Sequence, residues 1–105
     1  PPTKDCRGSS SLSMVNFFKK LKIKTFCFDP LFSKEEINAM GLKNLDEKSK
    51  FDLVIIANNN KFFSSIKFSK LLKKITRKNS KVYDCWECLN NNSKKNFIYK
   101  TIGEI

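Results

Sequence analysis

The chain of 105 residues contains no histidine and only three glycines. Without histidine it cannot hold a Ser-His or Cys-His catalytic pair, in which the imidazole takes the proton of the nucleophile. Its few glycines form no glycine-rich loop of the kind that cradles a phosphate. No apolar run approaches the ~20 residues that a membrane helix needs. The sequence therefore excludes these catalytic pairs, a glycine-rich phosphate loop and a membrane-spanning helix.

Positive charge is abundant, but nearly all of it comes from lysine. The formal net charge is +11, and Arg7 and Arg77 are the only arginines. A basic chain suits a phosphate-rich partner, so a small nucleic-acid-binding module is one interpretation. Arginine is the usual reader of base edges, and its scarcity favours a general lysine bias over a dedicated nucleic-acid surface. We therefore do not expect nucleic acid as the partner.

Four cysteines have irregular spacing, and no export signal accompanies them: Cys6, Cys27, Cys85 and Cys88. This pattern favours reduced thiols in the cytoplasm over a secreted disulfide framework. The last two form a Cys-x-x-Cys pair, which can be a redox couple or half of a zinc site. A zinc site needs about four ligands, and neither histidine nor a second such pair is present. We favour two small apolar residues after a strand, with a thiol protein as an alternative.

Segments of helical and strand-like pattern alternate along the chain. Apolar residues recur at helical spacing twice, and Ser33 with Glu36 forms a capping box for a further short helix that Gly41 ends. The helices are expected over 11–21, 34–40 and 68–75, the strands over 23–28, 53–57, 81–83 and 97–102, and a polar loop over 90–96. Strands that alternate with helices indicate an α/β fold with a parallel sheet.

Ligands bind to such sheets outside the carboxyl ends of the strands. The loops expected there begin at Asp29-Pro30, at Asn58 and at Asp84. A further polar segment, Thr3-x-Asp5-x-Arg7-x-Ser9, precedes the first helix and offers a hydroxyl, a guanidinium and backbone N–H groups to an anion. The pattern alone favours a simpler interpretation, in which Asp5 pairs with Arg7 and Ser9 caps the helix.

Taken in order, these segments resemble the C-terminal domain of the UDP-glucose/GDP-mannose dehydrogenase family. The resemblance starts with the T-x-D-x-R-x-S segment and covers essentially the whole chain. Its further matches are the strand end Asp29-Pro30, the glutamate-containing helix Lys34-Glu35-Glu36-Ile37, the strand Asp52-Leu53-Val54-Ile55-Ile56, Asn58-Asn59-Asn60 with Phe63, the strand Val82-Tyr83-Asp84 and the closing Ile102-Gly103.

The resemblance implies a fold and a role. The fold would be α/β: a three-layer Rossmann-like parallel sheet flanked by helices and truncated at the N-terminus, because the family's first strand is absent. Residues 1–105 would be a single substrate-nucleotide-binding domain, a fragment of a cytoplasmic enzyme of polysaccharide biosynthesis. That enzyme would be an oligomeric NAD-dependent nucleotide-sugar 6-dehydrogenase, which oxidises the C6 alcohol of a UDP-sugar or GDP-sugar to a carboxylate. NAD would bind to another domain, and this chain alone would not be active.

The resemblance also implies which residues bind. The residues expected near the substrate nucleotide are Thr3, Asp5, Arg7, Ser9, Asp84 and Trp86. The chain departs from the family after Asp84, where Cys85 and Trp86 replace a Gly-Arg pair whose arginine contacts substrate. It departs again at Asn60, which replaces a histidine. None of the four cysteines matches the catalytic cysteine of the family, and we expect no metal in this chain.

Overall fold

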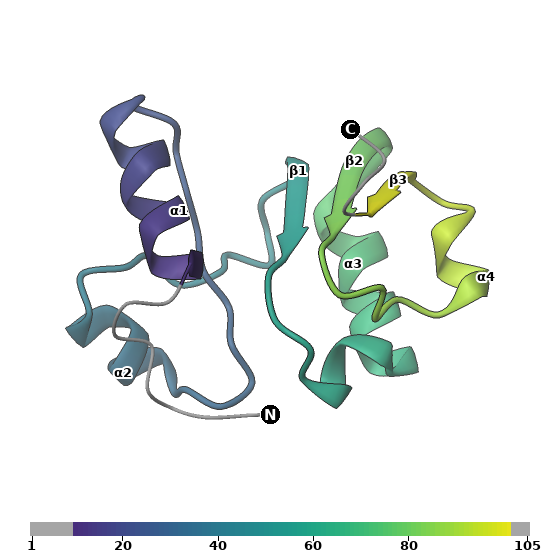
Figure 1. The fold of residues 1–105 in the computed structure, drawn as a ribbon, viewed down its shortest axis with the longest axis horizontal. Helices are drawn as coiled ribbons and strands as arrows, with labels where there is room; N and C mark the ends of the chain where they lie inside the picture. Colours follow the sequence, from purple (N-terminus) through teal and green to yellow (C-terminus); the bar gives the residue numbers. More distant parts are fainter. Residues whose placement is uncertain (1–9, 102–105) are drawn as a thin grey trace. The chain divides into compact units, whose positions relative to one another are not determined.

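A computed structural model of the chain describes residues 10–101 (Figure 1). The chain divides into two compact units, residues 1–46 and residues 47–105, which are described separately below. The described part of the first unit contains the helices α1 (Ser10–Lys20) and α2 (Lys34–Ala39). The second contains the parallel sheet that the sequence predicts. The assignment of residues 1–105 to one domain stays a prediction.

Both helices of the first unit end in a left-handed turn. Lys22 has a φ of 62° after α1, and the N–H of Ile23 reaches back to the carbonyl of Phe18 at 3.0 Å. Gly41 has a φ of 77° after α2, and the N–H of Leu42 reaches back to the carbonyl of Ile37. Glycine adopts this conformation without strain, as expected for the predicted end of α2.

The capping box at the start of α2 is confirmed. The Ser33 hydroxyl accepts a hydrogen bond from the N–H of Glu36 at 3.1 Å, and the Glu36 carboxylate accepts one from the N–H of Ser33 at 2.9 Å. Each side chain thus satisfies a backbone donor that the first turn leaves without a helical partner.

The predicted strand over residues 23–28 is wrong. Within residues 10–101, the segment forms one isolated parallel bridge, between Cys27 and Asn44, and no strand. Two backbone hydrogen bonds hold the bridge: the N–H of Cys27 donates to Lys43 at 2.7 Å, and the N–H of Leu45 donates to Cys27 at 2.9 Å. Residues with a high β-propensity extend a strand only when a neighbouring strand accepts their hydrogen bonds.

The second unit is built on three parallel strands in the order β1 (Phe51–Ile56), β2 (Thr76–Asp84) and β3 (Ile98–Thr101). A 3₁₀ turn, η1 (Lys61–Ser64), and the helix α3 (Ile66–Ile75) connect β1 to β2, and α3 lies along the sheet (Figure 1). The predicted α/β class with a parallel sheet flanked by helices is confirmed.

The core of the second unit lies between α3 and the sheet. Leu72 of α3 and Val82 of β2 are completely buried, and they share one cluster with Ile56, Phe63 and Phe68. The rings of Phe63 and Phe68 meet edge to face, with their centroids 5.0 Å apart, which is a favourable aromatic geometry. The buried positions of α3 recur at helical spacing, as the sequence predicts.

Two other details differ from the sequence prediction. β2 begins at Thr76 and not at Lys81, the predicted start. Its first part pairs irregularly with β1: Phe51 pairs with Thr76, whereas Leu53, two residues later, pairs with Lys81. The polar segment 90–96 is not only a loop, since it contains one helical turn, α4 (Asn91–Lys94). Asn90 caps this turn by accepting a hydrogen bond from the N–H of Ser93 at 3.1 Å, and a polar segment of this kind forms such a turn readily when its own side chains cap it.

Candidate functional site

The carboxyl ends of β1 and β2 bring two of the predicted ligand loops side by side. The N–H of Cys85, directly after β2, donates to the carbonyl of Ile56 at the end of β1, at 3.1 Å. Both Asp84 and Trp86 therefore lie at this edge of the sheet. The loop at Asp29-Pro30 belongs to the other unit, and Thr3, Asp5, Arg7 and Ser9 lie outside the described residues.

Asp84 is fully buried at the end of β2. Its Oδ2 atom accepts two hydrogen bonds, from the backbone N–H of Leu89 at 2.9 Å and from the Tyr99 hydroxyl at 2.8 Å. Its Oδ1 atom has no hydrogen-bond partner in the part of the chain that the structure describes. The two hydrogen bonds to Oδ2 link Asp84 both to the loop that follows β2 and to the neighbouring strand β3.

Trp86, in contrast to Asp84, is largely exposed to solvent. It is 57% exposed, and its indole N–H donates to the carbonyl of Ala57 at 3.1 Å. This hydrogen bond ties the loop after β2 to the loop after β1. The ring is therefore held at one edge and presents much of its surface to solvent at the carboxyl ends of the strands.

The two loops are tied together at a second place. The Cys88 thiol lies 3.6 Å from the carbonyl of Asn58, and the Ser64 hydroxyl donates to the carbonyl of Cys88 at 2.6 Å. Asn60, where the sequence resemblance implies a histidine, caps η1 by accepting a hydrogen bond from the N–H of Phe62 at 2.9 Å. The contacts of Cys88 link the segment after β1 to the loop after β2.

The three cysteines of the described part are free and only partly exposed. Burial raises the pKa of Cys85 and of Cys88 above the ordinary value of 9.0, and the negative charge of Asp84 raises it further. Burial also raises the pKa of Cys27, although the nearby Lys19 opposes the shift. Because the thiolate is the nucleophile and the metal ligand, these thiols are poor candidates for either role.

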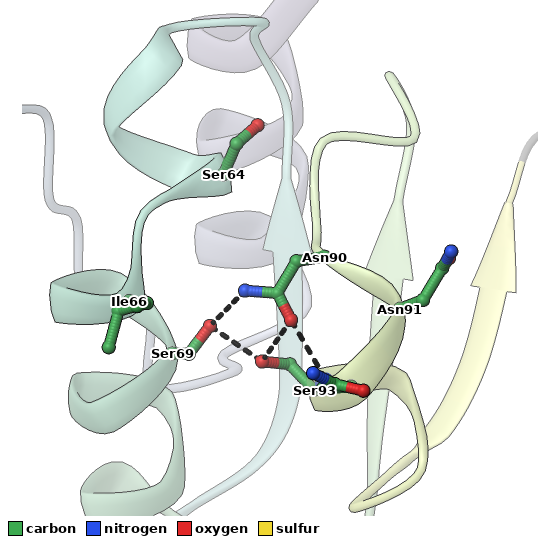
Figure 2. Close-up of a pocket in the computed structure, with 7 residues that line it drawn as sticks. Ser64, Ile66, Ser69, Asn90, Asn91 and Ser93 are labelled. Carbon is green, nitrogen blue, oxygen red and sulfur yellow. Dashed lines mark hydrogen bonds between the residues drawn. The ribbon is translucent and has the colours of Figure 1, made fainter.

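A shallow polar pocket lies between the start of α3 and α4 (Figure 2). Asn90 donates from its amide to the Ser69 hydroxyl at 3.1 Å, and the Ser93 hydroxyl donates to the same oxygen at 2.6 Å. Ser69 in turn donates to the carbonyl of Ser65 at 3.2 Å. These polar groups bond to one another, so the pocket acts as a brace that fixes α4 to α3. Its lining residues are Ser64, Ile66, Ser69, Asn90, Asn91, Asn92 and Ser93.

The sequence analysis places Asp84 and Trp86 at the end of a strand, as the structure does, but it does not indicate their hydrogen-bond partners. Tyr99 carries no motif, and its approach to Asp84 depends on the pairing of β2 with β3, where Val82 lies beside Tyr99 and Asp84 beside Thr101. The partner of Trp86 is a backbone carbonyl, which no side-chain pattern can indicate. The sequence indicated only that Asp84 ends a predicted strand and that Trp86 lies in the loop after it.

Among the described residues, no group of three or more His, Cys, Asp or Glu side chains could hold a metal ion. No described helix is long and apolar enough to cross a membrane. Residues 1–91 match a family model, the UDP binding domain of the UDP-glucose/GDP-mannose dehydrogenase family. No curated protein and no solved structure gives a significant match to the chain.

Proposed function

Because the chain belongs to the UDP-glucose/GDP-mannose dehydrogenase family and contains its UDP-binding domain, we propose that it binds the nucleotide part of a UDP-sugar at the carboxyl ends of β1 and β2. The match over residues 1–91 is the observation that carries this proposal. The position of Asp84 and Trp86 supports it, since ligands of parallel sheets bind at that edge.

The proposed contacts come from two segments of the chain. Thr3, Asp5, Arg7 and Ser9 would supply hydroxyl, guanidinium and backbone donors to the ligand, as the family resemblance implies. Trp86 would face the ligand directly from the loop after β2. Asp84 would position the loop and would not contact the ligand. Its carboxylate is fully buried and accepts hydrogen bonds from Leu89 and Tyr99.

The larger reaction belongs to a parent enzyme in this proposal. That enzyme would be a cytoplasmic, oligomeric, NAD-dependent 6-dehydrogenase of nucleotide sugars that serves polysaccharide biosynthesis, with UDP-sugar as the substrate class and GDP-sugar as the alternative. NAD would bind to a domain outside this chain. The raised pKa of Cys27, Cys85 and Cys88 supports this division, because a covalent thiol intermediate requires a readily formed thiolate.

Calorimetric titration of the chain with UDP-glucose and GDP-mannose tests the proposal. We expect weak, saturable binding of the UDP-sugar, and no NADH formation when NAD is added. If neither UDP-glucose nor GDP-mannose binds to the chain, the proposed function is rejected. Formation of NADH by this chain alone would reject the division of roles.

The alternative of a nucleic-acid-binding module predicts a different result. Binding through lysines releases counterions, so affinity for a single-stranded or duplex oligonucleotide would fall steeply as salt rises. We expect the oligonucleotide to give no saturable binding at a salt concentration at which the UDP-sugar still binds. Tight oligonucleotide binding together with no UDP-sugar binding would favour the alternative.

A further inference from the structure

Trp86 combines two properties that a core-filling residue does not have together. It is the only tryptophan of the chain, and it is 57% exposed. Tryptophan is a large aromatic side chain that contributes most to stability when it is buried. Its exposure at the carboxyl ends of β1 and β2 therefore leaves much of the ring surface available.

The ring is also held in place. Its N–H donates to the carbonyl of Ala57 at 3.1 Å, and the loop that carries it is fixed at both ends, by the N–H of Cys85 on Ile56 and by the N–H of Leu89 on Asp84. Within the loop, Glu87 adopts a left-handed backbone with a φ of 52°. An exposed ring that is already ordered loses little conformational freedom when a ligand stacks on it.

We propose that Trp86 is the stacking platform for the nucleobase of the nucleotide sugar, an inference that rests on the proposed function. The base is the only aromatic ring of such a ligand, and stacking needs a flat, accessible π surface of the kind that Trp86 presents. Trp86 stands where the family resemblance leads us to expect an arginine. A charged contact with the substrate is therefore replaced in this chain by a contact between two rings.

The replacement of arginine by Trp86 changes which part of the ligand contributes to binding at this loop. A ring that stacks on Trp86 binds through its face, and the interaction depends only weakly on ionic strength, unlike a contact between a cation and a phosphate. The neutral indole offers no charge to the diphosphate. The affinity that this loop contributes therefore depends on the base. A nucleotide without the sugar retains this contribution.

The test titrates the chain with UDP-glucose, UMP, ribose 5-phosphate and glucose 1-phosphate, by calorimetry and by tryptophan fluorescence. Because the chain has one tryptophan, its emission reports on Trp86 alone. UMP and UDP-glucose are expected to quench the emission, whereas the two sugar phosphates are not. Trp86→Ala is expected to weaken UMP binding by about tenfold or more, the size of one lost stacking contact.

Two further variants separate the ring from other effects. Trp86→Phe retains a stacking face but loses the N–H donor to Ala57, so it should weaken UMP binding less than Trp86→Ala does. Ile98→Ala removes another exposed apolar side chain of the same unit, 40% exposed on β3, and should leave the affinity unchanged.

The outcomes distinguish this inference from the proposed function. If UDP-glucose binds the original chain and the Trp86→Ala variant equally well, the stacking role is overturned and the proposed function stands. If glucose 1-phosphate quenches Trp86 as UDP-glucose does and UMP does not, the ring stacks on the sugar, and the assignment to the base is overturned. If no nucleotide binds the original chain, both proposals fall.

Discussion

The Tyr99 hydroxyl donates a hydrogen bond to Asp84 Oδ2 at 2.8 Å, which links the end of β2 to β3 through side chains. The same carboxylate oxygen accepts the N–H of Leu89, so it also closes the loop that carries Trp86. A single buried carboxylate thereby couples strand pairing to the shape of the candidate site. Stability and ligand binding should consequently respond together to changes at this position.

The first prediction concerns this hydrogen bond. Tyr99→Phe leaves Asp84 Oδ2 with one donor among the described residues, the N–H of Leu89, and we expect it to lower the free energy of unfolding by about 1–3 kcal/mol. Urea unfolding followed by the fluorescence of Trp86 measures the loss. The variant should also shift the native-state emission of Trp86, because Asp84 then holds the loop less firmly.

Tyr83→Phe is the matched control. Tyr83 is half-buried on β2, and no hydrogen bond from the described residues reaches its hydroxyl. This substitution should change the free energy of unfolding by no more than roughly 0.5 kcal/mol. Equal effects of the two substitutions would contradict the role given to the contact between Tyr99 and Asp84.

The second prediction concerns the core between α3 and the sheet. Leu72 is completely buried in the cluster that includes Val82, whereas Leu53 on β1 is 48% exposed. Leu72→Ala should cost about 2–5 kcal/mol, because it removes buried contacts and leaves a cavity. Leu53→Ala should cost less than about 1 kcal/mol. Urea unfolding of both variants checks the difference, and the reverse order would show that α3 does not cover the core.

The third prediction concerns the capping box of α2. Ser33→Ala removes the acceptor for the N–H of Glu36 and should destabilise the helix by about 0.5–2 kcal/mol. Because the first unit is described separately, the readout should be local, such as faster amide exchange of Met40, which donates to Glu36 and Ile37. Glu35→Gln, in the same turn but outside the box, is the control. Unchanged exchange in the Ser33→Ala variant would refute the capping role.

The fourth prediction concerns pH. Since Cys85 and Cys88 have a raised pKa in the folded chain, the unfolded chain releases their protons first as the pH rises. Their contribution to stability is thus fully present below about pH 9 and is lost as the pH rises through the folded pKa. The pH midpoint of alkylation should also be higher in the folded chain than in urea.

Mass spectrometry of the separate cysteine peptides at a series of pH values measures these midpoints. The urea-unfolded chain provides the reference for each thiol. A midpoint in the folded chain that is equal to or below the reference for Cys85 or Cys88 would show that burial and Asp84 do not suppress the thiolate.

The sequence determined the elements whose causes are local. The helical spacing of apolar residues located α3, the capping box located α2, and Gly41 supplied the conformation that ends it. The continuous apolar run located β1, and the order of the segments indicated a parallel sheet. The helix, the capping box and the glycine turn follow from contacts within a few residues, which a sequence pattern can show directly. The strand and the sheet were inferred from composition and from the order of the segments.

Only the tertiary structure decided which strand-like segments become strands and which polar residues meet. Residues 23–28 have the composition of a strand, but among the described residues they form one bridge, between Cys27 and Asn44, because a strand also depends on distant pairing partners. The pairing of β2 with β3 brings Tyr99 to Asp84, and the contact between two loops leaves Trp86 anchored yet exposed. These relations join residues far apart in the chain, so burial and hydrogen bonding in the folded protein establish them, and local propensity does not.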